Sequence, residues 1–172
     1  ALPICTQTFS SDALIHTITV GLGGGSTAYN TAVGLTALGA NTSGSFNSGF
    51  GALALCNVTT GVRNVGTGYA AGYYNQTGNG NVYLGYQAGL GVASNSHDDN
   101  SAFGYRALYG LTTGVANTAI GGGSYASGFP GALGRVTTGG SNTAIGRSAG
   151  WNLTTGNNNV YVGDFAVASA VG

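Results

Sequence analysis

Apolar and polar residues recur along most of this chain in one short unit. The unit reads asparagine, two variable residues, a mostly apolar residue and glycine, as in NTAVG, NVYLG and NTAIG. Five of the seven intervals between successive units are 17 residues long, and the other two are 19 and 25. The asparagines that open the eight units are Asn30, Asn47, Asn64, Asn81, Asn100, Asn117, Asn142 and Asn159. A repeat this short does not fit a helical hairpin and predicts one coil of a β-solenoid.

The positions of the unit have distinct roles in such a solenoid. The fourth position is apolar in seven of eight copies, so we expect it to stack into a core column inside the coils. The predicted core column comprises Val33, Phe50, Leu84, Phe103, Ile120, Ile145 and Val162, with Thr67 in the remaining copy. The glycine that follows favours a corner with positive φ. The equivalent asparagines are expected to form an amide ladder between coils.

A small residue comes three places after each glycine, alanine in seven copies and Ser124 in the eighth. It allows two backbones to approach closely, either across a narrow coil or at an axis shared by several chains. A turn signal such as LTTG ends most coils. We therefore predict an all-β fold, a β-solenoid or β-helix of about eight 17-residue coils, for residues 21–172.

Two kinds of segment depart from the repeat. Residues 1–20 lack a full unit, although 9–20 has strand character, and they are predicted to form an extended N-terminal arm. The arm is either a cap over the solenoid end or a strand donated to another subunit. Two coils also carry insertions, one around SNSHDD and a longer one that includes Phe129 and Pro130. In solenoids such insertions emerge as loops on one face, which is often the binding face.

Composition excludes several classes of function. The 172 residues include 34 glycines, four arginines and four aspartates, with no lysine, glutamate or methionine. Four scattered arginines do not form the basic patch that nucleic acid requires, and a P-loop needs a lysine. No apolar run reaches the ~18 residues of a membrane span. Because the net charge is zero, copies of the chain repel each other little, which favours self-association.

Two short sequences resemble sites of chemistry. Residues 146–150 fit the G-x-S-x-G pattern of serine hydrolases, with Ser148 at the nucleophile position. Ala70 and Gln87 hold the same position in other coils, so we interpret Ser148 as a variable residue of the repeat and predict no enzyme. His97, Asp98 and Asp99 are metal-ligand types, but adjacent ligands define no coordination geometry. We interpret them as a surface loop and expect no metal or cofactor.

Cysteines and aromatic residues supply the remaining candidates. Cys5 and Cys56 are candidates for a disulfide from the arm to the second coil or to a neighbouring subunit, and two free buried thiols are the alternative. Two sets of aromatic residues each share one position of the coil: Tyr69, Tyr86 and Tyr105, and Tyr73, Tyr109 and Trp151. Such columns either stack against sugar rings or are buried between chains, and the low charge favours burial.

The run from Ile18 to Gly44, followed by NTAIG and LTTG units, resembles the NTAVG-type repeats of phage tail fibres and bacterial cell-surface fibre proteins. It is more distantly similar to the head repeats of trimeric autotransporter adhesins. The resemblance covers about residues 12–172. It implies an extended, extracellular, homo-oligomeric β-fibre without catalytic activity in the repeat region.

These observations support two hypotheses of function. The first is a secreted structural subunit that forms an extracellular filament through its solenoid ends and N-terminal arm, by strand addition between copies. The second is a homotrimeric tail-fibre or adhesin shaft that binds surface glycans. Both place the chain at a cell surface, outside the cell or in a virion tail fibre. In both, its partners are copies of itself, without nucleic acid and without a membrane span.

Overall fold

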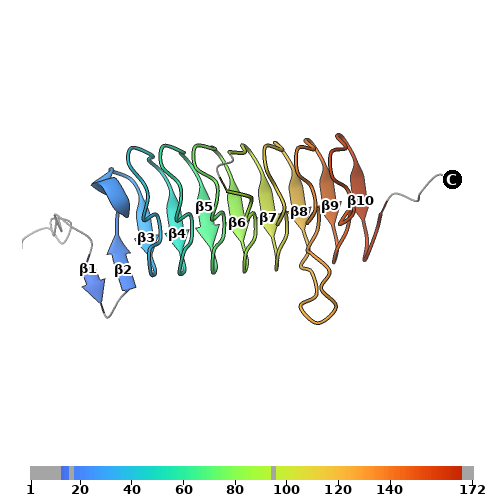
Figure 1. Ribbon diagram of the computed structural model, residues 1–172, viewed down its shortest axis with the longest axis horizontal. Helices are drawn as coiled ribbons and strands as arrows, with labels where there is room; N and C mark the ends of the chain where they lie inside the picture. The colour runs from blue at the N-terminus through green and yellow to red at the C-terminus, as the bar shows by residue number, and fades with distance from the viewer. Residues whose placement is uncertain (1–12, 16–17, 94–95, 168–172) are drawn as a thin grey trace, which may run out of the picture.

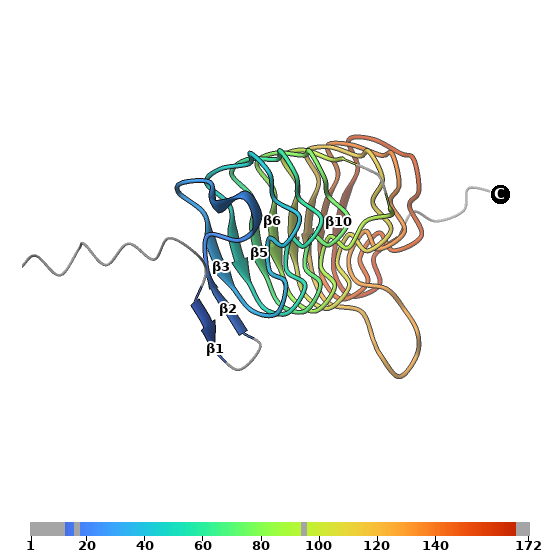
Figure 2. The same cartoon turned by 60° about the vertical axis from the view of Figure 1, so that its left-hand side comes forward.

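A computed structural model describes residues 13–15, 18–93 and 96–167 of the chain. These residues form a β-solenoid whose strands lie side by side in chain order in one ten-stranded sheet (Figures 1 and 2). The parallel strands are β3 (Thr31–Val33), β4 (Ser48–Phe50), β5 (Val65–Thr67), β6 (Val82–Leu84), β7 (Ser101–Phe103), β8 (Thr118–Ile120), β9 (Thr143–Ile145) and β10 (Val160–Val162). The all-β solenoid predicted from the repeat is confirmed.

The described part of the N-terminal arm is a hairpin at one end of the sheet. Strands β1 (Ala13–Ile15) and β2 (Ile18–Gly21) pair antiparallel, and β2 then pairs antiparallel with β3. A 3₁₀ turn, η1 (Gly24–Ser26), leads into the first coil. Within this chain the hairpin therefore occupies the edge of β3. Among the described residues, no helix is long and apolar enough to span a membrane.

The core is narrow, and six of the eight parallel strands face it with an alanine or a glycine, while β6 and β10 face it with a tyrosine. We call the second residues of β3–β10 the inner column; they are Ala32, Gly49, Gly66, Tyr83, Ala102, Ala119, Ala144 and Tyr161. All eight are buried. The opposite wall carries the repeated alanines and the residue after each of them, which is leucine or glycine in the coils from Ala37 to Ala149. The alanine position thus serves close approach across a narrow coil.

Large and small residues alternate between the two walls of this core. An added Cβ at Gly66 would lie 2.7 Å from Cγ of Leu55, which fills the space that Gly66 leaves. Tyr83 reverses the arrangement, because its ring lies against Gly72 and Gly89, where a side chain would collide with it. Gly150 has the same relation to Tyr161. Such complementarity keeps a close-packed interior without changing the coil.

The predicted core column is in register but lies outside the core. Strand pairing aligns the third residues of β3–β10 in one file, as the repeat predicts. We call this file the outer column; it comprises Val33, Phe50, Thr67, Leu84, Phe103, Ile120, Ile145 and Val162. Phe50 and Leu84 are 42% and 46% exposed, and Val162 is 68% exposed. Burial of the column is therefore wrong. Neighbouring strand residues point to opposite faces, and in this sheet the second residue of each strand faces the interior, so the third residue faces outward.

The asparagine ladder is confirmed. Each asparagine Oδ1 accepts the backbone N–H of the asparagine in the next coil, from Asn30 to Asn142. In most coils the side-chain Nδ2 also donates to the backbone carbonyl 14 residues ahead, as Asn47 does to Gly61 at 2.8 Å. The ladder thus joins successive coils and closes individual coils. It satisfies polar groups that would otherwise be buried without partners.

The glycine after the outer column also has the predicted role. Gly68 has φ +124°, and an added Cβ would lie 2.6 Å from the carbonyl oxygen of Gly85 in the next coil. A side chain is therefore excluded both by the backbone conformation and by the approach of the neighbouring coil.

The longer insertion begins earlier than the repeat suggests. Ala132 occupies the buried alanine position of its coil, since its carbonyl accepts the N–H of Leu108 and Leu133 donates to Ala149. The assignment of Ser124 to this position is therefore wrong. The extra residues lie between Gly121 and Ala132 and form the loop that projects below β8 in Figure 1.

Candidate functional site

The first aromatic set forms a continuous stack on the surface. The ring centroids of Tyr69 and Tyr86 are 5.2 Å apart, and those of Tyr86 and Tyr105 are 5.5 Å apart, with nearly parallel planes. Tyr125 in the insertion loop then meets Tyr105 edge-on at 6.4 Å. The predicted alignment of these tyrosines is confirmed, and the stack leads to the insertion loop.

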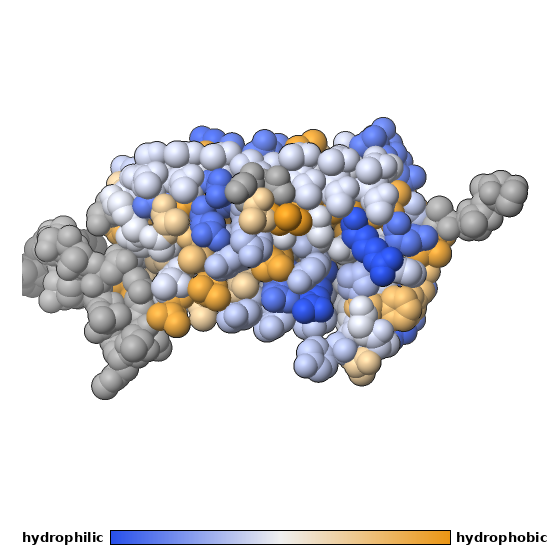
Figure 3. Space-filling view, in the orientation of Figure 1, coloured by the Kyte–Doolittle hydropathy of each residue, from blue (hydrophilic) through white to orange (hydrophobic). Residues whose placement is uncertain are grey.

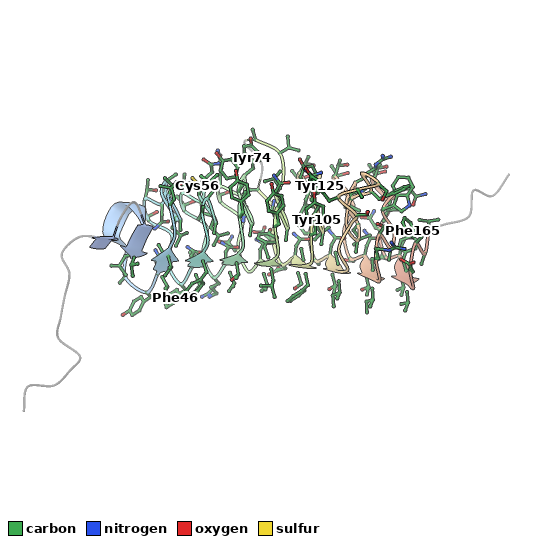
Figure 4. The ribbon with its side chains drawn as sticks, turned by 90° about the horizontal axis from the view of Figure 1, so that it is seen from below. Phe46, Cys56, Tyr74, Tyr105, Tyr125 and Phe165 are labelled. Atoms are coloured by element: carbon green, nitrogen blue, oxygen red, sulfur yellow. The ribbon has the colours of Figure 1, made fainter. Side chains whose placement is uncertain are left out.

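The second aromatic set is interrupted. Tyr73, Tyr109 and Trp151 do share one position, but Leu90 and Gly134 hold that position in the coils between them. Among the described residues their rings have other partners: Tyr73 contacts Tyr74 edge-on at 4.6 Å, and Trp151 contacts Phe129 at 5.1 Å. Figure 4 places Tyr74, Tyr125 and Cys56 on the side of the solenoid opposite Phe46 and the strands.

Arg106 links the two aromatic sets. Its guanidinium carbon lies 5.3 Å from the ring centroid of Tyr105 and 4.8 Å from that of Tyr109. Its Nε donates a 2.9 Å hydrogen bond to Oε1 of Gln87 in the preceding coil. Cation–π contacts and this hydrogen bond together restrict an otherwise flexible side chain. Arg106 is therefore held in place beside a cavity.

A surface pocket of about 400 Å³ lies between Arg106 and Arg135. Its lining residues are Arg106, Tyr109, Gly110, Gly128, Pro130, Gly134 and Arg135. The guanidinium carbon of Arg135 lies 4.6 Å from the ring centroid of Trp151. A smaller pocket of about 240 Å³ lies among Tyr69, Tyr73, Tyr74 and their neighbours and has no charged lining residue. The larger pocket thus combines two cations with aromatic and glycine surfaces.

The insertion loop supplies one wall of the larger pocket and is anchored at its C-terminal end. Phe129 packs edge-on against Trp151 and Phe165, with centroids 5.1 and 5.2 Å away. Ser124 N–H donates to the carbonyl of Phe129 at 2.9 Å, which closes the loop on itself. Figure 3 shows that hydrophilic and hydrophobic residues mix on the molecular face from which this loop projects.

Ser148 has a structural hydrogen bond. Its side chain is buried, and its hydroxyl donates to the carbonyl of Pro130 at 2.8 Å. Its φ of 52° matches those of Ala70 and Gln87, at 52° and 54°, which hold the equivalent position in other coils. The backbone conformation therefore belongs to the repeat, and the Ser148 side chain fastens the insertion loop.

His97 is buried, so its interpretation as a surface-loop residue is wrong. It occupies the position of the repeated turn glycine, and its carbonyl accepts the Nδ2 group of Asn81. Nδ1 lies 2.7 Å from the hydroxyl of Tyr83, while Nε2 is buried without a hydrogen-bond partner. Burial lowers the pKa of His97 to about 4, against smaller opposing effects of a backbone hydrogen bond and of Asp98.

The neighbours of His97 stay near the surface. Oδ1 of Asp98 accepts the backbone N–H of Asn79 at 2.6 Å, and Asp99 is exposed. Burial, with a smaller contribution from Asp98, raises the pKa of the Tyr83 hydroxyl well above its usual value. Among the described residues no three His, Cys, Asp or Glu side chains are grouped to hold a metal ion. The histidine and tyrosine therefore complete the core of this coil.

The predicted disulfide falls partly outside the described residues. Cys56 is half-buried, and its Sγ lies 3.9 Å from Oγ1 of Thr36 in the preceding coil. Cys5 belongs to the residues that the structure does not describe. The pairing of the two cysteines remains a prediction.

Sequence reasoning missed Arg106 and Arg135 as site residues because it counted the arginines as scattered. The coils bring them together, since the N–H of Gly110 donates to the carbonyl of Gly134 at 3.0 Å and aligns the segments that carry them. A usable signal was present in the sequence: Arg106 stands next to Tyr105 and three residues before Tyr109. Comparisons with protein-family models, curated proteins and solved structures find no match to the chain.

Proposed function

We propose that this protein is a structural subunit of a self-assembling extracellular filament or surface fibre. The observation that carries the proposal is the outer column, a file that is apolar except at Thr67 and follows the sheet through eight coils. Eight strands spaced about 4.8 Å apart extend over roughly 35–40 Å. Neither the first nor the third residue of any strand from β3 to β10 is charged.

An apolar file of this length favours association between copies. Monomeric proteins rarely leave a large continuous apolar patch exposed to water. Figure 4 shows the strands along one edge of the ribbon with side chains directed away from the coils, and Phe46 lies at the same edge. The ring of Phe46 stacks on Tyr29 at 5.0 Å, which adds apolar surface near β3 and β4. Zero net charge leaves little repulsion between copies.

Longitudinal growth would use the two edge strands of the sheet. In the described residues these are β1 of the N-terminal hairpin and β10. Edge strands carry unpaired backbone groups and readily accept a further strand. We propose that the arm of one copy adds to the solenoid end of the next, because the parallel strands repeat one register and a strand with the same pattern fits beside them.

Negative-stain microscopy of the purified chain tests this function directly. We expect long filaments, and light scattering should show a mass that grows with protein concentration. A chain that remains monomeric by both measurements would refute self-assembly. Deletion of residues 1–20 should give soluble, unpolymerised protein. Filament length is compared with that of a chain lacking only residues 1–12, which keeps the hairpin strands β1 and β2. Filaments of normal length after the longer deletion would exclude a role for the arm.

A face variant tests the outer column separately. Ile120→Asp combined with Ile145→Asp places two charges in the apolar file and should abolish assembly while the inner column stays intact. Thr113→Asp together with Thr155→Asp is the matched control, because both threonines are exposed in turns away from the strands. Equal assembly of the two double variants would show that the outer column takes no part.

The second candidate is a homotrimeric tail-fibre or adhesin shaft that binds surface glycans. The pocket beside the insertion loop favours it, because this pocket adds cations and aromatic rings to a protein that is otherwise nearly uncharged. A discrete trimer in light scattering, together with short uniform particles in negative-stain microscopy, would favour the shaft over the filament. For either function we propose no catalytic role, in keeping with the structural hydrogen bond of Ser148.

A further inference from the structure

Two of the four arginines line one pocket, and in the part of the chain that the structure describes neither has a carboxylate partner. Arg147 pairs with Asp164 at 2.7 Å, and these side chains shift each other's pKa, upward for Arg147 and downward for Asp164. Within the described residues, neither Arg106 nor Arg135 forms an ion pair. Both line the pocket of about 400 Å³ next to the insertion loop. The described lining of the pocket therefore carries two positive charges and no negative one.

The cation of Arg106 is already positioned to receive a ligand. Its Nε donates a hydrogen bond to Gln87, and its guanidinium carbon lies over the rings of Tyr105 and Tyr109. Among the described residues its two Nη groups have no hydrogen-bond acceptor. A guanidinium with free Nη groups recognises the oxygens of a carboxylate or sulfate through paired hydrogen bonds. Because the side chain is already ordered, binding loses less conformational entropy.

The rest of the pocket is suited to a ring with an apolar face. Tyr109 and Pro130 contribute flat apolar surface, and Gly110, Gly128 and Gly134 add no side chains. The pocket volume lies within the roughly 300–1,000 Å³ that is usual for small-molecule sites and exceeds the needs of a lone oxyanion. The carbonyl of Pro130 is held by Ser148, so this wall is fixed to the coil beneath it.

We propose that this pocket binds an anionic sugar, a saccharide ring that carries a carboxylate or a sulfate group. Arg106 and Arg135 bind the anion, and Tyr109 and Pro130 contact the apolar face of the ring. The inference rests on the second candidate function, because it gives the shaft its class of glycan. It also holds if the same subunits build a filament, since the pocket lies within one chain.

Fluorescence of Trp151 provides the test. Trp151 is the single tryptophan of the chain, and its ring stacks on Arg135 at the pocket. The full chain is titrated at constant ionic strength with glucuronate, glucose 6-sulfate, glucose, acetate and inorganic sulfate. We expect a saturable change in emission with at least one anionic sugar and weaker binding of the three controls, namely glucose, acetate and inorganic sulfate. The two anionic sugars distinguish a carboxylate ligand from a sulfate ligand.

Variants assign the response to the pocket. Arg106→Gln and Arg135→Gln should each raise the Kd at least about tenfold, because a hydrogen bond to a charged group is lost. Arg63→Gln is the matched control, since Arg63 is exposed and does not line the pocket. Circular dichroism of every variant verifies the fold.

Three results would overturn the proposal. One is no saturable response to either anionic sugar, and another is equal affinity for glucose. The third is equal affinity for acetate or inorganic sulfate, which would indicate an anion site without sugar recognition. Light scattering on the same samples separates this inference from the proposed function. Normal assembly without sugar binding would refute only the proposed sugar site. Saturable sugar binding by a chain that never associates would refute only the proposed fibre.

Discussion

The inner and outer columns are formed by adjacent residues of the same strands, yet the inner residues are buried and most of the outer residues are exposed. In β6, Tyr83 is fully buried, whereas Leu84 beside it is 46% exposed. In β8 the buried residue is Ala119, and the exposed one is the larger Ile120. Size and hydrophobicity therefore do not decide which residue enters the core. Strand alternation decides it, because the second residue of each strand points inward, and the opposite wall provides the matching space, with glycines facing a tyrosine.

The largest effect is expected from Tyr83→Ala. Removal of a buried aromatic ring should lower the free energy of unfolding by about 3–5 kcal/mol. Urea unfolding followed by circular dichroism measures the loss. Adding Gly89→Leu should restore part of the stability. The double variant then has an alanine and a leucine at the positions that Ala102 and Leu108 occupy in the next coil. If Gly89→Leu makes the Tyr83→Ala variant less stable still, the two walls do not complement each other as described.

Acid should destabilise the protein through His97. Its pKa is about 4 in the folded chain, mainly because of burial, against a usual 6.5. The unfolded chain binds more protons between these values, so the contribution is complete above pH 6.5 and declines as the pH falls towards 4. The total loss is about 3 kcal/mol at 1.36 kcal/mol per pKa unit.

Urea unfolding at pH 7, 5.5 and 4 measures this dependence. His97→Gln keeps a polar side chain that does not titrate, so it should flatten the curve between pH 6.5 and 4. An unchanged slope in that variant would mean that other groups cause the acid sensitivity.

Ala119→Leu tests the inner column from the other direction. Ala119 is fully buried in the same apolar cluster as Leu108 and Leu133. Extra carbon atoms in this narrow space should cost about 1–3 kcal/mol. A shift of the thermal midpoint measures the effect. Ile120→Leu on the outer side of the same strand is the control, because it leaves the volume of the side chain nearly unchanged. Equal midpoints for the two variants would contradict a narrow core at β8.

The smallest effect is expected from Leu84→Ala in the outer column. Because about half of this side chain is already exposed, truncation should cost about 1 kcal/mol or less in the isolated chain. It should instead reduce the concentration-dependent growth of mass in light scattering. A loss of stability as large as that of Tyr83→Ala would show that the outer column is part of the core.

The sequence predicted the repeat and its register better than the direction of its side chains. The asparagines and corner glycines were placed correctly, because each has a backbone requirement that recurs in every coil. Val33 and Phe50 were placed in the right file but on the wrong side, because a three-residue strand is too short for its alternation to identify the buried face. The prediction that His97 lies in a surface loop was wrong, because the two-residue insertion hides its place in the repeat. His97 occupies the turn position that Gly78 and Gly114 hold in the neighbouring coils.

The candidate site was predicted in part. The aromatic residues were found because they recur at fixed positions. Arg106 and Arg135 were not, because each occurs once at its position, and single occurrences leave no periodic signal. Their proximity arises from the stacking of coils and from the insertion loop, whose Pro130 and Gly128 form the pocket wall.

The sequence alone determines that this chain stacks short coils in one register, since regular spacing of asparagine and glycine gives every coil the same hydrogen bonds. Only the tertiary structure decides how each coil is filled. The position after the buried alanine has φ near 50–64° whether it holds Leu55, Leu108, Gly72 or Gly150. The backbone is thus constant there, and the side chain follows from the residue on the facing wall. Packing between coils depends on which side chains meet from positions far apart in the chain, and a repeating pattern does not specify these pairs.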